Sequence, residues 1–352
     1  MGTYYVDNDV GPAGGSGTPA DPYGIETAIA AAAPGDVFYW RGGGEGDVSP
    51  GHTLNFNKAG TAAAPIRWIG TDDNWNPIVP GQTPSTGVDG NDGPYAIVQI
   101  LASHQIFEGL RVHNALQGRY GGVTGVRLGA NRVLMRNCVV HDCGIGFNSE
   151  MPGHEFVQCR TDDVGTGWIG SAMSVLCYQC VVHDTVGHAF RALGGMSLVG
   201  CRAHALGGCG VEFYRDHTNP GILWVDHFSV YDCADGVKIN AYGGLSASVF
   251  LVSNSLFDTC SGYAVSVTVP AGQLGFLLNN GSRNCTSGQV QAGRTGLIQE
   301  GWVALPASPF VDAAHGDLAL VRSTSAIGAA LDGGDLGALQ RRFSRLPHPV
   351  QW

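Results

Sequence analysis

Four cysteines at a constant interval constrain the fold of this chain more than any other feature. Cys138, Cys159, Cys180 and Cys201 follow one another 21 residues apart. Around each of them apolar and polar residues alternate until glycine or aspartate interrupts the pattern, which favours short strands over helices. Helical repeats need about 33 residues or more. A repeat of 21 residues is enough for three short strands and three turns, one coil of a parallel β-helix.

The 21-residue repeat also predicts which side chains lie inside. Stacked coils repeat at the strand spacing of about 4.8 Å, so equivalent positions form ladders along the axis. Strand alternation places each cysteine, and the residue two positions later (Val140, Val182), in the interior. We therefore expect an interior ladder of free thiols. Neighbouring cysteines would also lie within disulfide range, which is the alternative.

Composition bears on the partners. The formal net charge is −10 and there is no basic stripe, which argues against nucleic acid. No window reaches 18 consecutive apolar residues, so we expect no membrane insertion. The first residues, MGTYYVDNDVGPAGG, lack the features of a secretory signal. We expect assembly in a cytoplasm, or alternatively secretion with a signal that this sequence does not contain.

The order of segments predicts a single elongated domain. We expect an N-terminal strand and a short capping helix in residues 1–35, a parallel β-helix of about 21–27 residues per coil in 36–303 with a loop insertion at 71–95, a closing segment over the second end in 304–340, and a basic, aromatic arm in 341–352. The arm is either a frayed tail or a segment that docks on a partner.

Both ends of the chain resemble a known superfamily. The run YYVD, a glycine-rich turn, ADPY, AIAAAAPGD, VFYWRGG and LNFNKAGTAAAPIRWIG is similar to the start of right-handed parallel β-helix proteins of the pectate-lyase superfamily. The stretch SPFVDAAHGDLALVRSTSAIGAALDGGDLGAL resembles the segment with which many of them close. The resemblance implies a right-handed, single-stranded β-helix. The superfamily includes polysaccharide lyases, hydrolases, epimerases and phage tailspikes, and the start of this chain is similar to phage-encoded members.

In this superfamily the ligand groove follows the sheet made by the strand after the Gly or Asp-Gly turn. Alternation in that strand places Val211, Phe213, Val237 and Ile239 inside. The outward residues form two predicted rows, Arg127, Gly146, Gly167, Ala189, Glu212, Lys238, Ala264 and Gly129, Asn148, Ile169, Arg191, Tyr214, Asn240, Ser266. Their charged and polar members predict a ligand-binding patch of Arg191, Glu212, Tyr214, Arg215, Lys238 and Asn240, with Asp216 and His217 in the adjoining loop.

The patch suggests chemistry on an acidic glycan. A lyase needs a base, here Lys238 or Tyr214, and a cation for the substrate carboxylate, here Arg191 or calcium. The segment DGVKIN resembles the Gly-x-Lys strand of one pectate lyase family, which implies that Lys238 is the base. A hydrolase would instead pair Glu212 with Asp216 or Asp235. We commit to no catalytic residue, because Glu212 and Lys238 also fit a cross-strand ion pair on a solvated sheet.

Three patterns allow a metal site, and in each the structural explanation is preferred. The column His141, Asp162, His183 and His204 could be a set of zinc ligands or a polar ladder on the outer face. The ladder is preferred, because tetrahedral zinc needs ligands that converge from several directions and these residues lie on one line. The Cys177-x-x-Cys180 pair is not matched by a second Cys-x-x-Cys pair elsewhere in the sequence, which a four-cysteine metal site would need. The DGNDG run at 89–93 is a calcium site or a solvated turn. We expect no cofactor, with calcium as the alternative.

These features favour a structural protein of a bacteriophage virion. It would be a head decoration or a tail-associated module that contacts a host surface polysaccharide, with other virion proteins bound through the arm from Arg341 to Trp352. A homotrimer is a further expectation. The alternative is an enzyme, a polysaccharide lyase or glycoside hydrolase that acts around Lys238.

Overall fold

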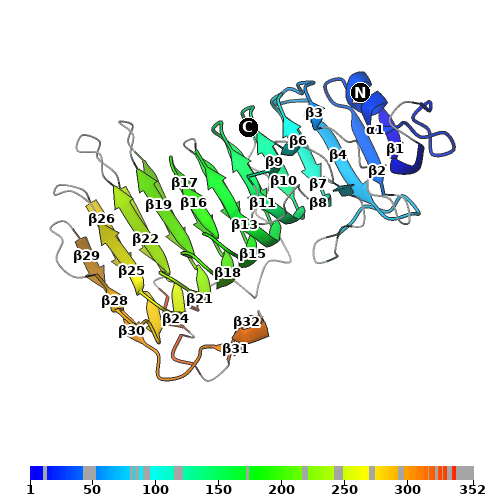
Figure 1. Ribbon diagram of the computed structural model, residues 1–352. Helices are drawn as coiled ribbons and strands as arrows, with labels where there is room; N and C mark the ends of the chain where they lie inside the picture. Colours follow the sequence, from blue (N-terminus) through cyan, green and yellow to red (C-terminus); the bar gives the residue numbers. More distant parts are fainter. Residues whose placement is uncertain are drawn as a thin grey trace.

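The chain forms a right-handed parallel β-solenoid with three sheets along its length, as predicted (Figure 1). The computed structural model describes residues 1–10, 14–42, 53–79, 82, 84, 87–89, 96–114, 122–171, 174–215, 221–241, 249–268, 274–291, 297–315, 317–321, 324–326, 328–330 and 335–337. None of the helices in these ranges is long and apolar enough to cross a membrane.

The solenoid has three sheets, here called sheets A, B and C, and a complete coil contributes one strand to each. Sheet A has 12 strands, in the order β1 (Thr3–Asp7), β2 (Val37–Arg41), β4 (Ile66–Thr71), β7 (Gln105–Glu108), β10 (Val133–Arg136), β12 (His154–Val157), β14 (Val175–Tyr178), β17 (Met196–Val199), β20 (Ile222–Asp226), β23 (Val249–Ser253), β26 (Leu274–Leu278) and β29 (Leu297–Glu300). Sheet B contains β5 (Gly87–Asp89), β8 (Arg111–His113), β15 (Val181–Thr185), β18 (Arg202–Leu206), β21 (Ser229–Cys233), β24 (Leu256–Cys260), β27 (Gly281–Arg283) and β30 (Val303–Ala304). Sheet C contains β3 (Leu54–Phe56), β6 (Ala96–Ile100), β9 (Thr124–Leu128), β16 (Phe190–Ala192), β19 (Val211–Arg215), β22 (Val237–Ala241), β25 (Tyr263–Thr268) and β28 (Gly288–Val290). The long strands β11 (Val139–Ser149) and β13 (Arg160–Gly170) pass through the corner between sheets B and C and belong to both.

The cysteine column lies inside, at the corner between sheets A and B. Cys138, Cys159, Cys180 and Cys201 are at most 2% exposed, and all ten cysteines of the chain are free. The thiols donate to carbonyls of the preceding coil, as Cys159 Sγ does to Met135 O at 3.4 Å. Burial raises the pKa of the Cys138, Cys159 and Cys180 thiols well above the ordinary value, so they stay protonated. The predicted interior ladder is confirmed.

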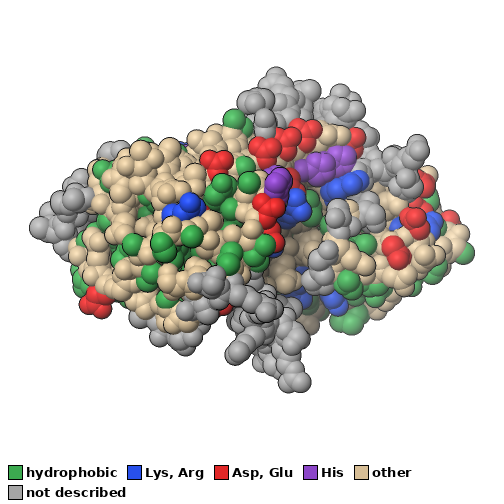
Figure 2. Space-filling view, turned by 90° about the horizontal axis from the view of Figure 1, so that it is seen from below, with side chains coloured by type: hydrophobic (Ala, Val, Ile, Leu, Met, Phe, Trp, Pro, Cys, Tyr) green, Lys and Arg blue, Asp and Glu red, His purple; other side chains and the backbone are tan. Residues whose placement is uncertain are grey.

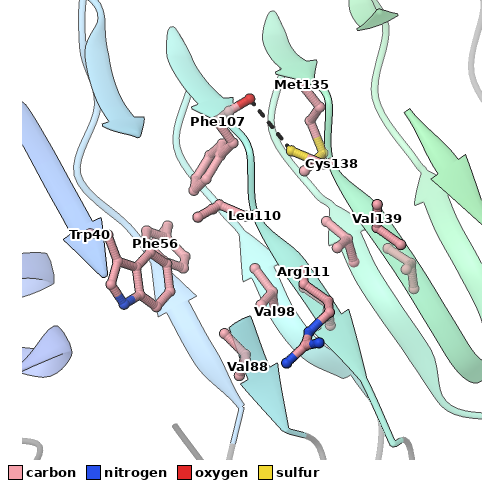
Figure 3. A pocket seen from close by; sticks show the side chains of 13 residues that line it. Trp40, Phe56, Val88, Val98, Phe107, Leu110, Arg111, Met135, Cys138 and Val139 are labelled. Atoms are coloured by element: carbon pink, nitrogen blue, oxygen red, sulfur yellow. Dashed lines mark hydrogen bonds between the residues drawn. The ribbon is translucent and has the colours of Figure 1, made fainter. Parts of the chain in front are cut away.

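Interior aromatic rings extend the stacking along the axis. Trp168 stacks between Phe147 and Phe190, with ring centroids 4.9 and 5.0 Å apart. A cavity of about 10 Å³ remains between earlier coils, surrounded by Trp40, Phe56 and other apolar side chains (Figure 3). That volume is about one water probe, so the interior cavity cannot hold a substrate.

Sharp corners explain the repeated polar letters of the sequence. Just after the histidine and aspartate column, Asp142, Asp163 and Asp184 adopt φ values of 52°, 49° and 51°. Asparagine and aspartate tolerate this left-handed region better than other side chains, because their short polar groups bond to nearby backbone. The same backbone turn therefore recurs on successive coils, where the chain passes from sheet B to sheet C.

The N-terminal helix covers one end of the solenoid (Figure 1). Helix α1 (Ile25–Ala31) buries Ile25, Ala28 and Ile29 against the core, and the short 3-10 helix η1 (Asn8–Val10) follows β1. Strand β1 pairs in parallel with β2, so the chain begins inside sheet A.

The described part of the C-terminal segment lies beside sheet B, whereas we had expected the segment to pack over the second end of the solenoid. Strands β31 (Phe310–Asp312) and β32 (Asp317–Leu320) pair antiparallel around the 3-10 helix η3 (Ala313–His315) and lie beside the outer surface of sheet B (Figure 1). Phe310 and Leu318 pack there with Leu256 and Tyr231. The described part departs from the expectation because sheet B carries apolar side chains on its outer face, against which Phe310 and Leu318 pack. The predicted arm 341–352 lies outside the described residues.

Candidate functional site

The outer face of sheet C carries one row of mostly polar side chains in register. Its members are Asn55, Gln99, Arg127, Asn148, Ile169, Arg191, Glu212, Lys238 and Ser266. The two predicted rows are wrong at three steps. Arg127 pairs with Asn148 and not with Gly146, Arg191 pairs with Glu212 and not with Tyr214, and Lys238 pairs with Ser266 and not with Ala264. The interior placement of Val211, Phe213, Val237 and Ile239 is confirmed, since none of them is exposed.

Core packing explains the error in the predicted rows. Phe190 is fully buried on Trp168 and pairs with Val211 on the next coil, which fixes Arg191 against Glu212. Ala189, which we expected in the outward row, is fully buried. Ala264 is buried in the same way. A small side chain gives no polarity signal, so strand alternation could not find this shift.

Glu212 is the centre of the site, because two nitrogen groups converge on its carboxylate. Its Oε2 lies 2.9 Å from Arg191 Nε and 3.2 Å from His188 Nε2, and the side chain is only 9% exposed. Lys238 is aligned with Glu212 on the next coil. The cross-strand ion pair that we considered for Glu212 and Lys238 is thus replaced by pairing to Arg191 and His188.

His188 is a member of the site that the sequence analysis missed. Its Nδ1 accepts the Cys209 backbone N–H at 3.1 Å, so the neutral ring carries its proton on Nε2, facing Glu212. Burial lowers the pKa of His188; the carboxylate of Glu212 opposes this shift, and Arg191 and Lys238 add to it. The only signal was a histidine in GHAF where two earlier coils have GIGF and GTGW.

The remaining predicted ligand-binding residues fall into two groups. Arg191 Cζ lies 5.6 Å from the ring centroid of Tyr214, a cation–π contact that orders both side chains. Asn240 is aligned with Tyr214 but is only 7% exposed, so it offers little surface to a ligand. Arg215 ends β19 and its side chain lies outside the described residues, as do Asp216 and His217.

Asp235, the other carboxylate proposed for a hydrolase, serves the backbone. Its Oδ1 accepts the Tyr263 N–H at 2.7 Å across one coil. This bond holds the corner that leads into β25, so the carboxylate has a structural task.

The histidine and aspartate column lies on the outer face of sheet B. His113 stacks on His141 with centroids 4.8 Å apart, and His183 stacks on His204 at 4.7 Å. Burial lowers the pKa of His141 and His204, and the neighbouring histidine lowers each further. On the face shown in Figure 2, histidines gather with acidic and basic side chains near the middle of the molecule.

No metal site emerges from the described part of the chain. There, no group of three or more histidine, cysteine, aspartate or glutamate side chains is arranged to hold an ion. The stacked rings of the sheet B column follow one line, as in a polar ladder. Of the DGNDG run only Asp89 is described, at the end of β5, and 90–93 lie outside the described residues.

Comparison with known proteins finds the fold again. No family model and no curated protein matches the sequence. Pectate lyase Pel9A superposes with a TM-score of 0.72 and 16% identity over 97% of each chain. An alginate lyase from Paenibacillus sp. strain FPU-7 has a TM-score of 0.54 and 12% identity, over 86% of this chain and 99% of that one. A rhamnogalacturonan lyase has a TM-score of 0.54 and 12% identity, over 88% and 91%. At these identities the likeness shows the β-helix fold alone.

Proposed function

We propose that this protein is a polysaccharide-degrading enzyme, a lyase that acts on acidic glycans at the outer face of sheet C. The observation that carries the proposal is the alignment of Arg191, Glu212 and Lys238 on three successive coils. They place a guanidinium, the carboxylate paired with it and a lysine amine on one face of the sheet, beside the ring of Tyr214. The three neighbours in fold are named as lyases of pectate, alginate and rhamnogalacturonan, which supports the same substrate class.

The reaction we assign is a β-elimination. A base removes the proton from the carbon next to the uronate carboxylate, and the electron pair of that C–H bond forms a C=C bond. The C–O bond to the neighbouring sugar then breaks, and the leaving oxygen takes up a proton. Lys238 is the proposed base, because its amine lies on the sheet one coil after Glu212. Arg191 binds the substrate carboxylate, where negative charge accumulates in the transition state.

The other groups of the site would set the geometry. Glu212 pairs with the Arg191 guanidinium and His188 pairs with Glu212, and this reduces the reorganisation needed when the substrate binds. Tyr214 offers an aromatic face to a sugar ring and is the alternative base. A glycoside hydrolase is less well supported, since it needs a second free carboxylate and Asp235 holds a corner of the backbone.

The virion role favoured by the sequence has less support than the enzyme. None of the three neighbours in fold is named as a phage protein. Virion partners, a trimer and assembly in a host cytoplasm stay predictions, and the arm from Arg341 to Trp352 that would bind such partners lies outside the described residues.

A panel of acidic polysaccharides tests the proposal. Wild-type protein is expected to release products that absorb ultraviolet light through the new C=C bond. Lys238→Ala is expected to lose this activity, while Arg67→Ala on sheet A keeps it. Absence of absorbing products across polygalacturonate, alginate and rhamnogalacturonan would refute the lyase and return weight to a glycan-binding virion protein.

A further inference from the structure

The polar row on sheet C continues well beyond Arg191 toward the N-terminus. Arg127 belongs to the same row, and register leads from Arg127 through Asn148 and Ile169 to Arg191. Arg127 thus lies three coils before Arg191. With a strand spacing of about 4.8 Å, the two positions are roughly 14 Å apart along the axis.

Like Arg191, Arg127 forms an ion pair with a glutamate one coil further on, and the Arg127 pair also has hydrogen-bond geometry, which Arg191 Nε lacks. Its Nε and Nη2 donate to Glu150 Oε1 and Oε2, both at 2.8 Å, and Asn148 Nδ2 donates to Glu150 Oε1 at 3.4 Å. The Arg127 side chain is 41% exposed, close to the 37% of Arg191. A guanidinium has five N–H donors, and this ion pair uses two of them. A fixed, half-exposed cation with remaining donors suits a carboxylate ligand.

The surface between the two arginines leaves room for an extended chain. Asn148 and Ile169 are half-buried and do not rise above the sheet as long charged side chains would. Beyond Arg127 the row continues through Gln99 to Asn55, beside a hollow of about 290 Å³ between α1 and β3. Lys58 lines that hollow and supplies a further cation.

We propose that Arg127, fixed by Glu150, forms a second subsite for an acidic sugar, separate from the Arg191 site. The ligand is one carboxylated glycan chain, long enough to contact both arginines as it runs along sheet C. This inference rests on the proposed function, because it extends the substrate of that site. It makes a separate statement about chain length: long chains bind through both arginines, whereas short chains bind at Arg191 alone.

The competing explanation is an ordinary surface ion pair, which contributes little and binds nothing. The protein contains a matched example for comparison. Arg67 Nη2 lies 2.8 Å from Glu108 Oε1 on the outer face of sheet A, and the two side chains are 42% and 23% exposed. This pair shares the chemistry and exposure of the Arg127 pair but lies on another face of the solenoid.

The test measures dissociation constants by calorimetry for trimer and decamer fractions of oligogalacturonate and of oligoalginate. Wild-type protein, Arg127→Gln and Arg67→Gln are each measured in the cold, where cleavage is slow. Arg127→Gln is expected to weaken decamer binding about tenfold, the effect of one charge-assisted hydrogen bond, and to leave trimer binding unchanged. Arg67→Gln is expected to change neither. Thermal unfolding of both variants checks that they are folded.

Three results would overturn the subsite. Decamer affinity unaffected by Arg127→Gln, an equal loss for trimer and decamer, or an equal loss in Arg67→Gln would each do so. If wild-type protein binds neither fraction, the proposed function fails and the subsite with it. If wild-type protein binds both without a chain-length effect of Arg127→Gln, only the subsite fails.

Discussion

A buried histidine on sheet A makes the stability of the solenoid sensitive to acid. His154 is fully buried at the start of β12, in a column with Val133 and Val175. Its Nδ1 accepts the Val133 N–H at 3.4 Å, and Nε2 has no partner among the described residues. Burial lowers the pKa of His154 to about 4, because a charged imidazolium would lose its hydration there. We predict that His154→Leu removes this sensitivity.

The magnitude follows from the difference between folded and unfolded states. The ordinary pKa of 6.5 falls to about 4 on folding, so the unfolded chain takes up a proton that the folded one refuses. The contribution of His154 to the free energy of unfolding is fully present above pH 6.5 and is lost as the pH falls toward 4. At about 1.36 kcal/mol per pH unit, the loss is about 2 kcal/mol at pH 5 and about 3 kcal/mol when complete.

Urea unfolding at pH 7.5 and at pH 5 measures this difference. Between these conditions wild-type protein should lose about 2 kcal/mol more than His154→Leu, since all other titrating groups are shared and cancel in the comparison. His315→Gln, which changes an exposed histidine, should behave as wild type. Equal losses in wild type and His154→Leu would refute the reasoning, whatever the stability of the variant at pH 7.5.

Substitutions at three further positions probe the site and the core. His188→Gln keeps an N–H donor toward Glu212, so it should retain most lyase activity, while His188→Leu should lower kcat/KM about tenfold or more; equal kinetics for both would remove His188 from the site. Trp168→Ala should cost about 3 to 5 kcal/mol in urea unfolding because it empties the aromatic stack, and a loss below 1 kcal/mol would contradict that packing. Ala205→Gly should raise the free energy of unfolding by about 1 kcal/mol, because Ala205 has φ 55° at a corner and glycine adopts this conformation without strain. A lower free energy of unfolding in urea would speak against strain there.

The fold was predictable because the repeat carries its own register. Once the cysteines define one interior column, strand alternation assigns the neighbours, and the structure confirms Val140 and Val182 inside. The later change to intervals of 27 residues also fits, since Ser229 N bonds to Cys201 O and Leu256 N bonds to Phe228 O. Hydrophobic period alone thus fixed most of the core.

The site was less predictable, because it depends on corners whose lengths differ between coils. The patch stays a prediction as a ligand site, and within it Arg191 was assigned to the wrong partner. The burial of Ala189, which no pattern of polarity reveals, decides that register. His188 was missed because its role comes from the Cys209 amide on the next coil, a contact across 21 residues. The position of the C-terminal segment beside sheet B likewise depends on apolar side chains that come together on the outer face of the sheet only after folding.

The central claim is that the outer face of sheet C cleaves acidic glycans by elimination. Nuclear magnetic resonance of the products from polygalacturonate or alginate tests it most directly, because elimination and hydrolysis leave different chain ends. We expect an unsaturated sugar at each new non-reducing end, formed by wild-type protein and absent with Lys238→Ala. Saturated ends, or unsaturated ends that form equally well with Lys238→Ala, would contradict it.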